Sequence, residues 1–317
     1  MELLPLVIVT PALAAANNGN WQTAQRWARM LAGDYRVRVV ERWQQGDEAL
    51  MIALHARRSA PSVAAWRALP VPRPLVVVLT GTDLYRDIAV DASAQQSLAL
   101  ADRLLVLNER GLLALPEALR AKGRVCLQST PARLPLAKTG RHLRALMVGH
   151  LREEKSPQTW FEAARLLRHR NDILLDHIGA PLDPALADEA AALALEQPHY
   201  RWLGALPHGA TRRRIQAAHV LVHASRMEGG AHVVIEAVTS GTPVLASRID
   251  GNLGLLGADY GGCFDWGDAA ALAALLQRCR DDAAMLPALQ VQCAARAPLF
   301  EPARERQTLL ALLQALR

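Results

Sequence analysis

Residues 225–237 read SRMEGGAHVVIEA, and the fold predicted for the chain can be built outward from this stretch. An apolar run at 220–223 predicts a buried strand before it, and the spacing of apolar residues predicts a helix over 231–240 after it. Glycines ahead of a helix leave backbone N–H groups open to a ligand, and the helix dipole places positive charge there. The stretch therefore predicts an anion-binding turn formed by Gly229, Gly230 and Ala231.

Two glutamates frame this turn. Glu228 directly precedes the glycines, and Glu236 lies about a turn and a half inside the predicted helix. A carboxylate at that depth can accept two hydrogen bonds from a vicinal diol, such as the ribose of a nucleotide. Taken singly, each acid is better explained as an ordinary loop or helix residue. Together with the glycines, they indicate a nucleotide site.

The chain on both sides alternates short apolar runs with helical patterns. The predicted strands are 4–9, 37–40, 49–54, 75–80, 103–107 and 124–128, then 143–148, 173–178, 200–203, 220–223 and 243–246. The predicted helices are 21–31, 59–69, 93–100 and 112–121, then 159–167, 183–195, 209–217 and 231–240. This alternation predicts parallel sheets with helices on both faces, which bind ligands at the carboxyl ends of their strands.

A polar, proline-containing stretch at 131–144 separates the two halves and sets the predicted domains. We expect an α/β protein of two Rossmann-like parallel-sheet domains, 1–138 and 139–298, that face each other across a cleft. The length of 317 residues agrees with two domains of roughly 150 residues each. The apolar stripe of 301–317 predicts an amphipathic helix, so 299–317 is expected to pack back on the N-terminal domain.

Composition excludes several classes of function. Apolar residues make up 51% and charged residues 21%, as in globular proteins. The 7 Trp, 4 Tyr and 3 Phe supply few stacking platforms for single-stranded nucleic acid, while a net charge of +6 suits small anionic ligands. The 4 cysteines are far apart and lack zinc-ligand spacing. We therefore expect a cytoplasmic protein that binds neither nucleic acid nor a metal.

The uncharged stretch at 3–25 raises the question of a signal peptide or membrane span. Glu2 stands where a signal peptide carries basic residues, Pro11 interrupts the apolar run, and polar residues at 17–22 would be stranded in lipid. A buried strand followed by a polar loop explains the segment better, so no stable membrane insertion is expected.

The spacing Glu228-x7-Glu236, with small residues between and Gly241-Thr242-Pro243 after, resembles the signature of GT-B glycosyltransferases of the large retaining family 4. The resemblance covers the C-terminal half and agrees with the two-domain layout. It implies that Glu236 holds the ribose of a nucleotide-sugar and that Glu228 lies by the donor sugar and its phosphate. By the same resemblance, 139–298 is the donor domain and 1–138 the acceptor domain.

A second segment, VGHLREEK at 148–155, resembles the Gly-Arg…Lys loop of that family. In the family, this Arg and Lys clamp the donor diphosphate and stabilise the leaving nucleotide. Lys155 matches, but His150 stands at the Arg position, and Arg152 is expected to supply the lost charge. The alternative is that the segment is a solvated run of surface charges.

Three loops of the N-terminal half follow predicted strands, where the same fold places ligands. The first ends in Gly19 and Asn20; in this fold the loop contacts the donor phosphate or the acceptor, and we expect these two residues at the donor, although Asn-Gly is also a common turn signal. The other two carry the candidate acceptor residues. These are His55, Arg57 and Arg58 in one loop, and Thr82, Asp83 and Arg86 in the other. Many family members carry a His where Thr82 stands, so ordinary hydroxyl-acceptor chemistry is in question.

Four separated segments are similar to one branch of this fold, the selenosugar synthases of selenoneine biosynthesis. They are ALHARRS at 53–59, LTGTDLY at 79–85, GHLREEK at 149–155 and GNLGLLG at 251–257. The similarity implies that a UDP-sugar, expected to be UDP-N-acetylglucosamine, is coupled to selenophosphate to give a 1-selenosugar, UDP and phosphate. It also implies a functional link to an enzyme that produces selenophosphate. No cofactor is expected.

The chemistry of selenophosphate agrees with the residues present. It is already anionic at neutral pH and its selenium is nucleophilic, so it requires no strong general base. It requires cations around its oxygens, and Arg57, Arg58 and Arg86 can supply them. The expected acceptor site comprises His55, Arg57, Arg58, Thr82, Arg86 and Asn252. Asp83 is the candidate for orienting the water that hydrolyses the P–Se bond.

Two other functions remain open at this point. One is a conventional GT-B transferase acting on a hydroxyl or lipid acceptor, and the other is a catalytically silent sensor of nucleotide-sugars. A nicotinamide-dependent dehydrogenase is disfavoured, because no GxGxxG motif follows the first predicted strand.

Overall fold

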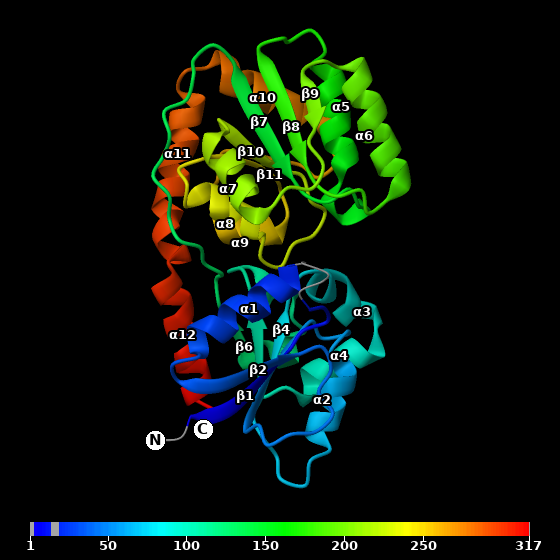
Figure 1. Ribbon diagram of the computed structural model, residues 1–317, viewed down its shortest axis with the longest axis vertical. Coiled ribbons are helices and arrows are strands. Elements are labelled where there is room, and N and C mark those ends of the chain that lie inside the picture. The colour runs from blue at the N-terminus through cyan, green and yellow to red at the C-terminus, as the bar shows by residue number, and fades with distance from the viewer. Residues whose placement is uncertain (1–2, 14–18, 317) are drawn as a thin grey trace. The chain divides into compact units, whose positions relative to one another are not determined.

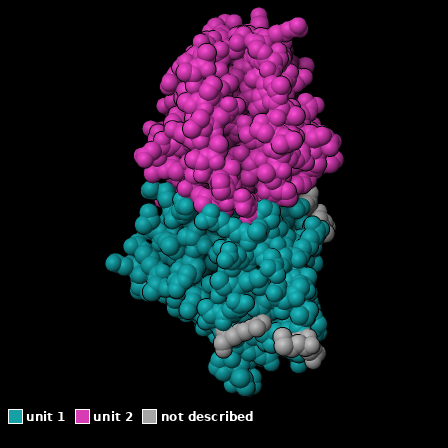
Figure 2. Space-filling model, turned by 90° about the vertical axis from the view of Figure 1, so that its left-hand side faces the viewer, with its two compact units in different colours: residues 1–128, 228–230, 302–317 teal, residues 129–227, 231–301 magenta. Residues whose placement is uncertain are grey.

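The structure, a computed structural model that describes residues 3–13 and 19–316, consists of two compact units. Unit 1 comprises residues 1–128, 228–230 and 302–317, and unit 2 comprises residues 129–227 and 231–301 (Figure 2). The domains predicted from the sequence divide the chain at 138 and 298 instead. Each unit is described below by itself.

Unit 1 contains a six-stranded parallel sheet in the order β2-β1-β3-β4-β5-β6 (Figure 1). Its strands are β1 (Leu4–Val9), β2 (Tyr35–Val40), β3 (Leu50–Leu54), β4 (Leu75–Leu79), β5 (Arg103–Val106) and β6 (Gly123–Val125). Every residue of β3 and β4 is buried, as expected for central strands covered on both faces. The runs of Val, Leu and Ile that predicted these strands therefore reflect their place in the sheet.

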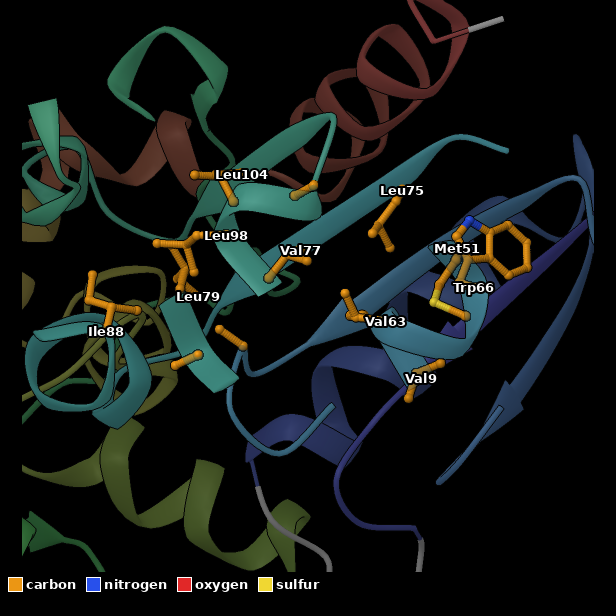
Figure 3. Close-up of a cluster of buried hydrophobic side chains, with 14 of the residues drawn as sticks. Val9, Met51, Val63, Trp66, Leu75, Val77, Leu79, Ile88, Leu98 and Leu104 are labelled. Carbon is orange, nitrogen blue, oxygen red and sulfur yellow. The ribbon is translucent and has the colours of Figure 1, made fainter. Parts of the chain in front are cut away.

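Alternate residues of the strands enter two cores, one on each face of this sheet. In β1, Val7 and Val9 join a cluster that contains Trp66, whereas Leu6 and Ile8 join a second cluster. Figure 3 shows the first cluster, in which side chains from the strands and from the surrounding helices meet. The helices of unit 1 are α1 (Gly19–Leu31), α2 (Ala60–Arg67), α3 (Ile88–Val90), α4 (Ala92–Leu100) and α12 (Pro302–Gln314).

The last helix, α12, completes the second core of unit 1. Its Leu309, Leu312 and Leu313 are buried in that cluster. Its Glu305 accepts a hydrogen bond of 2.6 Å from the indole nitrogen of Trp27 and pairs with the guanidinium of Arg26 at 3.1 Å. Buried polar groups require hydrogen-bond partners, and Glu305 finds them in Trp27 and Arg26 of α1. These contacts, together with the leucines, fix the position of α12 against α1.

Unit 2 contains a second six-stranded parallel sheet, in the order β12-β11-β10-β7-β8-β9. Its strands are β7 (Leu143–Val148), β8 (Ile173–Ile178), β9 (Tyr200–Trp202), β10 (Val220–His223), β11 (Val244–Ser247) and β12 (Cys263–Phe264). Its helices are α5 (Pro157–Leu166), α6 (Pro184–Glu196), α7 (His208–Ala217), α8 (His232–Val238), α9 (Asp250–Leu256), α10 (Ala269–Asp281) and α11 (Met285–Arg296).

The strand order places the loops of interest at one point of each sheet. In unit 1, β2 lies on one side of β1 and the next strand, β3, lies on its other side. In unit 2, β8 and β9 lie on one side of β7, and the chain then returns to place β10 on the other side of β7. Open α/β sheets bind ligands beyond the carboxyl ends of the strands at such a switch point. The α/β class with two Rossmann-like parallel sheets is therefore confirmed, and the loops after β3, β7 and β10 follow strands that border a switch point.

Several elements differ from the sequence prediction. The helix expected over 112–121 is instead two short 3-10 helices, Gly111–Ala114 and Glu117–Lys122, because Pro116 lies between them. The loop that follows β4 contains a π-helical turn, Asp83–Asp87. The helices α9, α10 and α11 and the strand β12 were not predicted. Within the described ranges, no helix has the length and apolar character needed to cross a membrane.

Candidate active site

The loop after β7 is held in place by tight backbone packing in unit 2. A Cβ atom on Gly179, at the end of β8, would overlap the carbonyl oxygen of Gly149, so only glycine permits this approach. The same carbonyl accepts a hydrogen bond of 3.2 Å from Nε2 of His177, whose Nδ1 lies 3.2 Å from the hydroxyl of Tyr200. Burial lowers the pKa of His177 to about 4, so the ring is neutral and donates from Nε2. These contacts fix the backbone position of Gly149, at the start of the loop after β7.

The three basic residues predicted for this loop differ in what they offer. His150 accepts a hydrogen bond of 3.0 Å at Nδ1 from the backbone N–H of Ala180. Burial, and then the charges of Arg152 and Lys155, lower the pKa of His150, so this ring supplies no charge at neutral pH. Arg152 keeps an exposed side chain whose Nε is 3.9 Å from a carboxylate oxygen of Glu154. The positive charge of the loop therefore comes from Arg152 and Lys155.

Arg226 joins the loop after β10 to the loop after β7. Its backbone N–H donates to the carbonyl of Glu154 at 2.9 Å, and its guanidinium lies 3.2 Å from the carboxylate of Glu153. The guanidinium also lies over the ring of Trp266 at 5.1 Å, and the Trp266 indole N–H donates to the hydroxyl of Ser156 at 2.8 Å. Sequence reasoning gave Arg226 no role, because nothing local indicates that strands β7 and β10 are neighbours.

Glu236 is the centre of a buried charge cluster in unit 2. Its side chain is 2% exposed, and its Oε1 lies 2.6 Å from Nε2 of His208, 3.3 Å from Nδ1 of His232 and 3.9 Å from Nε of Arg212. Burial raises the pKa of this carboxyl group, but the hydrogen bonds from His208 and His232 outweigh burial and bring the pKa to about 2. Glu236 is therefore ionised at all ordinary pH values.

Sequence reasoning missed the residues of α7 that complete this cluster. His208 is the first residue of α7 and Arg212 lies one turn later, so both side chains lie on the same face of that helix. Arg212 is nearly buried and is fixed by Thr130 Oγ1 and by the carbonyl of Pro131 at 3.1 Å. In both His208/Arg212 and His232/Glu236 the two residues are four apart, which places them on one face of a helix. This spacing is the sequence feature from which the cluster could have been predicted.

Asn252, predicted to contact the acceptor, is fully buried in α9. Its amide nitrogen donates to the carbonyl of Ser247 at 2.9 Å and lies 3.1 Å from the Ser247 hydroxyl. That hydroxyl in turn donates to the carbonyl of Ser225 at 2.6 Å. Asn252 thus positions the start of the 225–237 stretch through Ser247, and a contact with a ligand stays a prediction.

The segment Glu228–Gly230 groups with unit 1. A Cβ atom on Gly229 would lie 2.7 Å from the backbone nitrogen of Gly81, and the carbonyl of Gly229 accepts a hydrogen bond of 2.8 Å from the side chain of Asn108. Close backbone packing is therefore one reason for glycine at Gly229. Ala231 is the N-cap of α8. The roles of these residues and of Glu228 toward a donor stay predictions.

In unit 1, Asp83 joins the ends of β3 and β4. Its Oδ1 accepts backbone hydrogen bonds from Thr80 at 2.8 Å and Gly81 at 2.9 Å, and its Oδ2 accepts one from Ala56 at 2.9 Å. The side chain is 0% exposed. A carboxylate whose oxygens are engaged in this way orders the two loops, and its predicted role with water has no support from these contacts.

His55 lies directly after β3 with a left-handed φ of 71°, a conformation that non-glycine residues adopt mainly where surrounding contacts enforce it. Its Nδ1 accepts from the backbone N–H of Arg58 at 3.4 Å, and its Nε2 lies 3.2 Å from Oγ1 of Thr82. Burial is the main effect on this ring and lowers the pKa of His55. The neutral ring therefore donates from Nε2 to Thr82, leaving the Thr82 hydroxyl proton for another acceptor.

Asp87 brings two of the predicted arginines together. One oxygen of this nearly buried carboxylate pairs with Nε of Arg57 at 2.8 Å and the other pairs with Nε of Arg86 at 3.0 Å. Arg58 is exposed beside them. The side chains of Arg57 and Arg86 are 41% and 46% exposed, so both guanidinium groups are partly accessible to solvent. The sequence prediction did not include Asp87, which lies in the unpredicted π-helical turn.

The remaining predicted donor residues lie at the start of α1. Gly19 is the first residue of that helix, Asn20 is the second, and the carbonyl of Gly19 accepts from the hydroxyl of Thr23 at 2.8 Å. Residues 14–18 of the same loop lie outside the described residues. Among the residues that are described, no group of three or more His, Cys, Asp or Glu side chains is arranged to hold a metal ion.

Comparison with known proteins agrees with this architecture. Residues 132–297, just over half of the chain, match the model of the family "Glycosyl transferases group 1". The chain belongs to that family and is a glycosyltransferase. A search of curated proteins found no match.

Solved structures with the same fold include two that match over nearly their whole length. HepE of Anabaena, in complex with UDP-glucose, has a TM-score of 0.79 at 14% identity over 99% of this chain and 100% of its own. Sucrose-phosphate synthase of Thermosynechococcus elongatus has a TM-score of 0.78 at 17% identity over 99% of each chain. A mutant of S. aureus TarM, crystallised with UDP, matches with a TM-score of 0.68 at 13% identity over 83% of this chain. The chain spans 55% of the length of that TarM chain. These likenesses establish the GT-B fold.

Proposed function

We propose that this glycosyltransferase uses a UDP-sugar, with UDP-N-acetylglucosamine as the expected donor, and transfers the sugar to selenophosphate. The observation that carries the acceptor is the pair of arginines on Asp87, whose carboxylate lies 3.9 Å from Nε2 of His55, directly after β3. In the reaction, the bond from the sugar C1 to the UDP oxygen breaks and a C1–Se bond forms. Water then cleaves the P–Se bond, so the products are a 1-selenosugar, UDP and phosphate.

The donor half of the proposal is supported by the loops of unit 2. Glu236 is ionised at the switch point and presents acceptor oxygens for a ribose diol. Arg152 and Lys155 carry positive charge on the loop after the adjacent strand, β7, where a departing diphosphate requires stabilisation. HepE, which shares the fold, was crystallised with UDP-glucose.

The acceptor half is supported by the chemistry that unit 1 offers. A sugar hydroxyl acceptor requires a base, yet Asp83 is engaged by backbone N–H groups and His55 donates to Thr82. Selenophosphate requires no base, and the positive charge of the partly exposed Arg57 and Arg86 side chains suits its oxygens. Resemblance of 53–59 and 79–85 to the selenosugar synthases agrees with this choice. Neither a cofactor nor a metal is part of the proposal.

The direct test is to incubate the protein with UDP-N-acetylglucosamine and either selenophosphate or a panel of carbohydrate acceptors. We expect a selenium-containing sugar, detected by mass spectrometry, together with stoichiometric UDP and phosphate. UDP release that occurs only with a hydroxyl acceptor would overturn the selenium proposal and keep the glycosyltransferase. Repeating the assay with other UDP-sugars identifies the donor.

A second acceptor class is favoured by one feature of unit 1. A cavity of about 430 Å³ lies beside the π-helical turn that carries Arg86. Its lining is mainly apolar: Leu84, Tyr85, Ile88, Ala89, Ala114, Leu115 and Pro116, with Glu117 and Arg120. Such a cavity fits the apolar part of a larger acceptor that carries a hydroxyl group. Acceptors with an alkyl or aryl aglycone therefore belong in the same assay, and activity with them alone would favour this second function.

A further inference from the structure

The carboxylate of Glu236 is covered by a side chain that is itself mostly in solvent. Glu236 is 2% exposed, whereas the His208 side chain is 64% exposed and its Nε2 lies 2.6 Å from Glu236 Oε1. A ligand hydroxyl that binds this oxygen has to share it with His208 or displace it. The imidazole therefore controls access to Glu236.

The three basic groups on Oε1 are not equally fixed. Arg212 is also held by Thr130 and Pro131, and Nε2 of His232 donates to the carbonyl of Ser129 at 3.2 Å. Among the residues that the structure describes, His208 has Glu236 as its one hydrogen-bond partner. It also begins its helix, directly after the connection at 203–207. His208 is therefore the group with the freedom to leave.

We propose that His208 is a positioning residue that gates Glu236 by pH: as imidazolium it occupies Oε1 and competes with the ribose hydroxyls of the donor, and as neutral imidazole it yields that oxygen. This inference rests on the proposed UDP-sugar donor and names the regulation of the same site. The two states differ by one proton on His208 and need no change in the backbone.

The direction of the pH effect follows from the contacts. The hydrogen bond to Glu236, the largest effect, raises the pKa of His208, so the imidazolium persists above its usual range. Burial of the ring and the charges of Arg212 and Arg133 oppose this rise. His232 on α8 faces Glu236 and Ser129 with its two nitrogens and does not leave. As pH rises, His208 loses its proton and the donor should bind more tightly, and donor binding should release that proton.

The experiment is calorimetric titration of UDP, and of uridine as a probe without phosphate, between about pH 5.5 and about pH 8.5. Wild type is compared with His208→Gln, His208→Lys and His169→Ala, the last being an exposed control. We expect wild-type affinity to rise about two- to fivefold across this range, the size of a partly exposed ion pair. His208→Gln should bind tightly at every pH, His208→Lys weakly at every pH, and His169→Ala like wild type.

Proton release provides a readout that a merely structural role would not move. Titrations in buffers of different ionisation enthalpy should show release of a fraction of a proton per UDP in wild type and a smaller release in His208→Gln. Equal release in both proteins, or an affinity that falls with rising pH for uridine, overturns the gate. Failure of wild type to bind UDP at any pH would instead overturn the proposed donor, so the two failures are distinguishable.

Discussion

The two candidate sites use buried acids in opposite ways. In unit 1, Asp87 pairs with both Arg57 and Arg86, whose side chains remain partly exposed. In unit 2, Glu236 is itself the buried group, held by His208, His232 and Arg212. An acid that organises exposed cations creates a site for anions, whereas cations that hold an acid ionised create a site for hydroxyl donors. The contrast predicts an anionic acceptor in one unit and a ribose in the other.

The largest effect is expected for Glu236→Ala. Charged hydrogen bonds contribute about 1.5–3 kcal/mol, so UDP affinity measured by calorimetry should fall by a factor of about 10–100. Glu236→Gln keeps the shape of the side chain but not its charge, so its UDP affinity should lie between those of wild type and Glu236→Ala. Unchanged UDP affinity in Glu236→Ala would show that the charge cluster in unit 2 has only a structural role and would contradict the ribose site proposed there.

Lys155→Ala tests the loop after β7. The side chain is expected to stabilise charge that develops on the leaving diphosphate, so kcat should fall about 10–100-fold while UDP affinity changes less. His150→Ala is the matched variant from the same loop. Because His150 carries no charge at neutral pH, its effect on kcat should be smaller. A larger loss in His150→Ala would contradict the assignment of charge to Lys155 and Arg152.

Arg57→Ala sharpens the comparison from the side of unit 1. Loss of one of the two guanidinium groups on Asp87 should raise the KM for selenophosphate about tenfold, because a charge-assisted contact is removed, and should leave UDP affinity unchanged. Arg29→Ala removes an exposed arginine of α1 that the proposals do not involve, and it should behave as wild type. Steady-state kinetics with varied acceptor measures the effect. If UDP affinity falls as well, the two sites are not separate.

The smallest effect concerns stability in acid. The pKa of Glu236 is lowered from 4.5 to about 2, so the unfolded chain takes up this proton more readily than the folded one. The contribution is present in full above pH 4.5 and is lost as the pH falls toward 2. Urea unfolding should show about 1 kcal/mol less stability at about pH 4 than at about pH 7 from this group, and a flatter pH dependence in Glu236→Gln. If the unfolding free energies of wild type and Glu236→Gln show the same dependence on pH, the prediction is contradicted.

The fold was predictable because it rests on local patterns. The mainly apolar runs at 143–148, 173–178 and 220–223 coincide with β7, β8 and β10, since strands buried on both faces are rich in apolar residues; Arg144, Asp176 and His177 are polar residues within them that fit this pattern least. Helix α12 was evident from its leucine spacing. The two-residue strand β12 is too short to produce a periodic signal, and helix propensity over 112–121 was overridden by Pro116.

The candidate sites were predictable only in part. Single motifs such as the glutamate pair and the basic segments lie in one stretch of sequence and were found there. Their partners come from elsewhere: His208 is far from Glu236 along the chain, and Arg226 reaches Glu153 only because β10 and β7 pair. Asp83 was recognised, but its contacts with the backbone of Ala56 and Gly81 require the register of two strands. Tertiary neighbours of this kind leave no local signal.

The place of α12 has a consequence for how the protein is made. During synthesis residues 1–128 precede unit 2, yet the leucines and Glu305 of α12, which pack with Trp27, follow residue 301. Until then, the nascent first unit has an open apolar face, while every residue of unit 2 has already been made. The first unit, whose strands are translated before those of the second, therefore receives its covering helix only after the second unit has been translated.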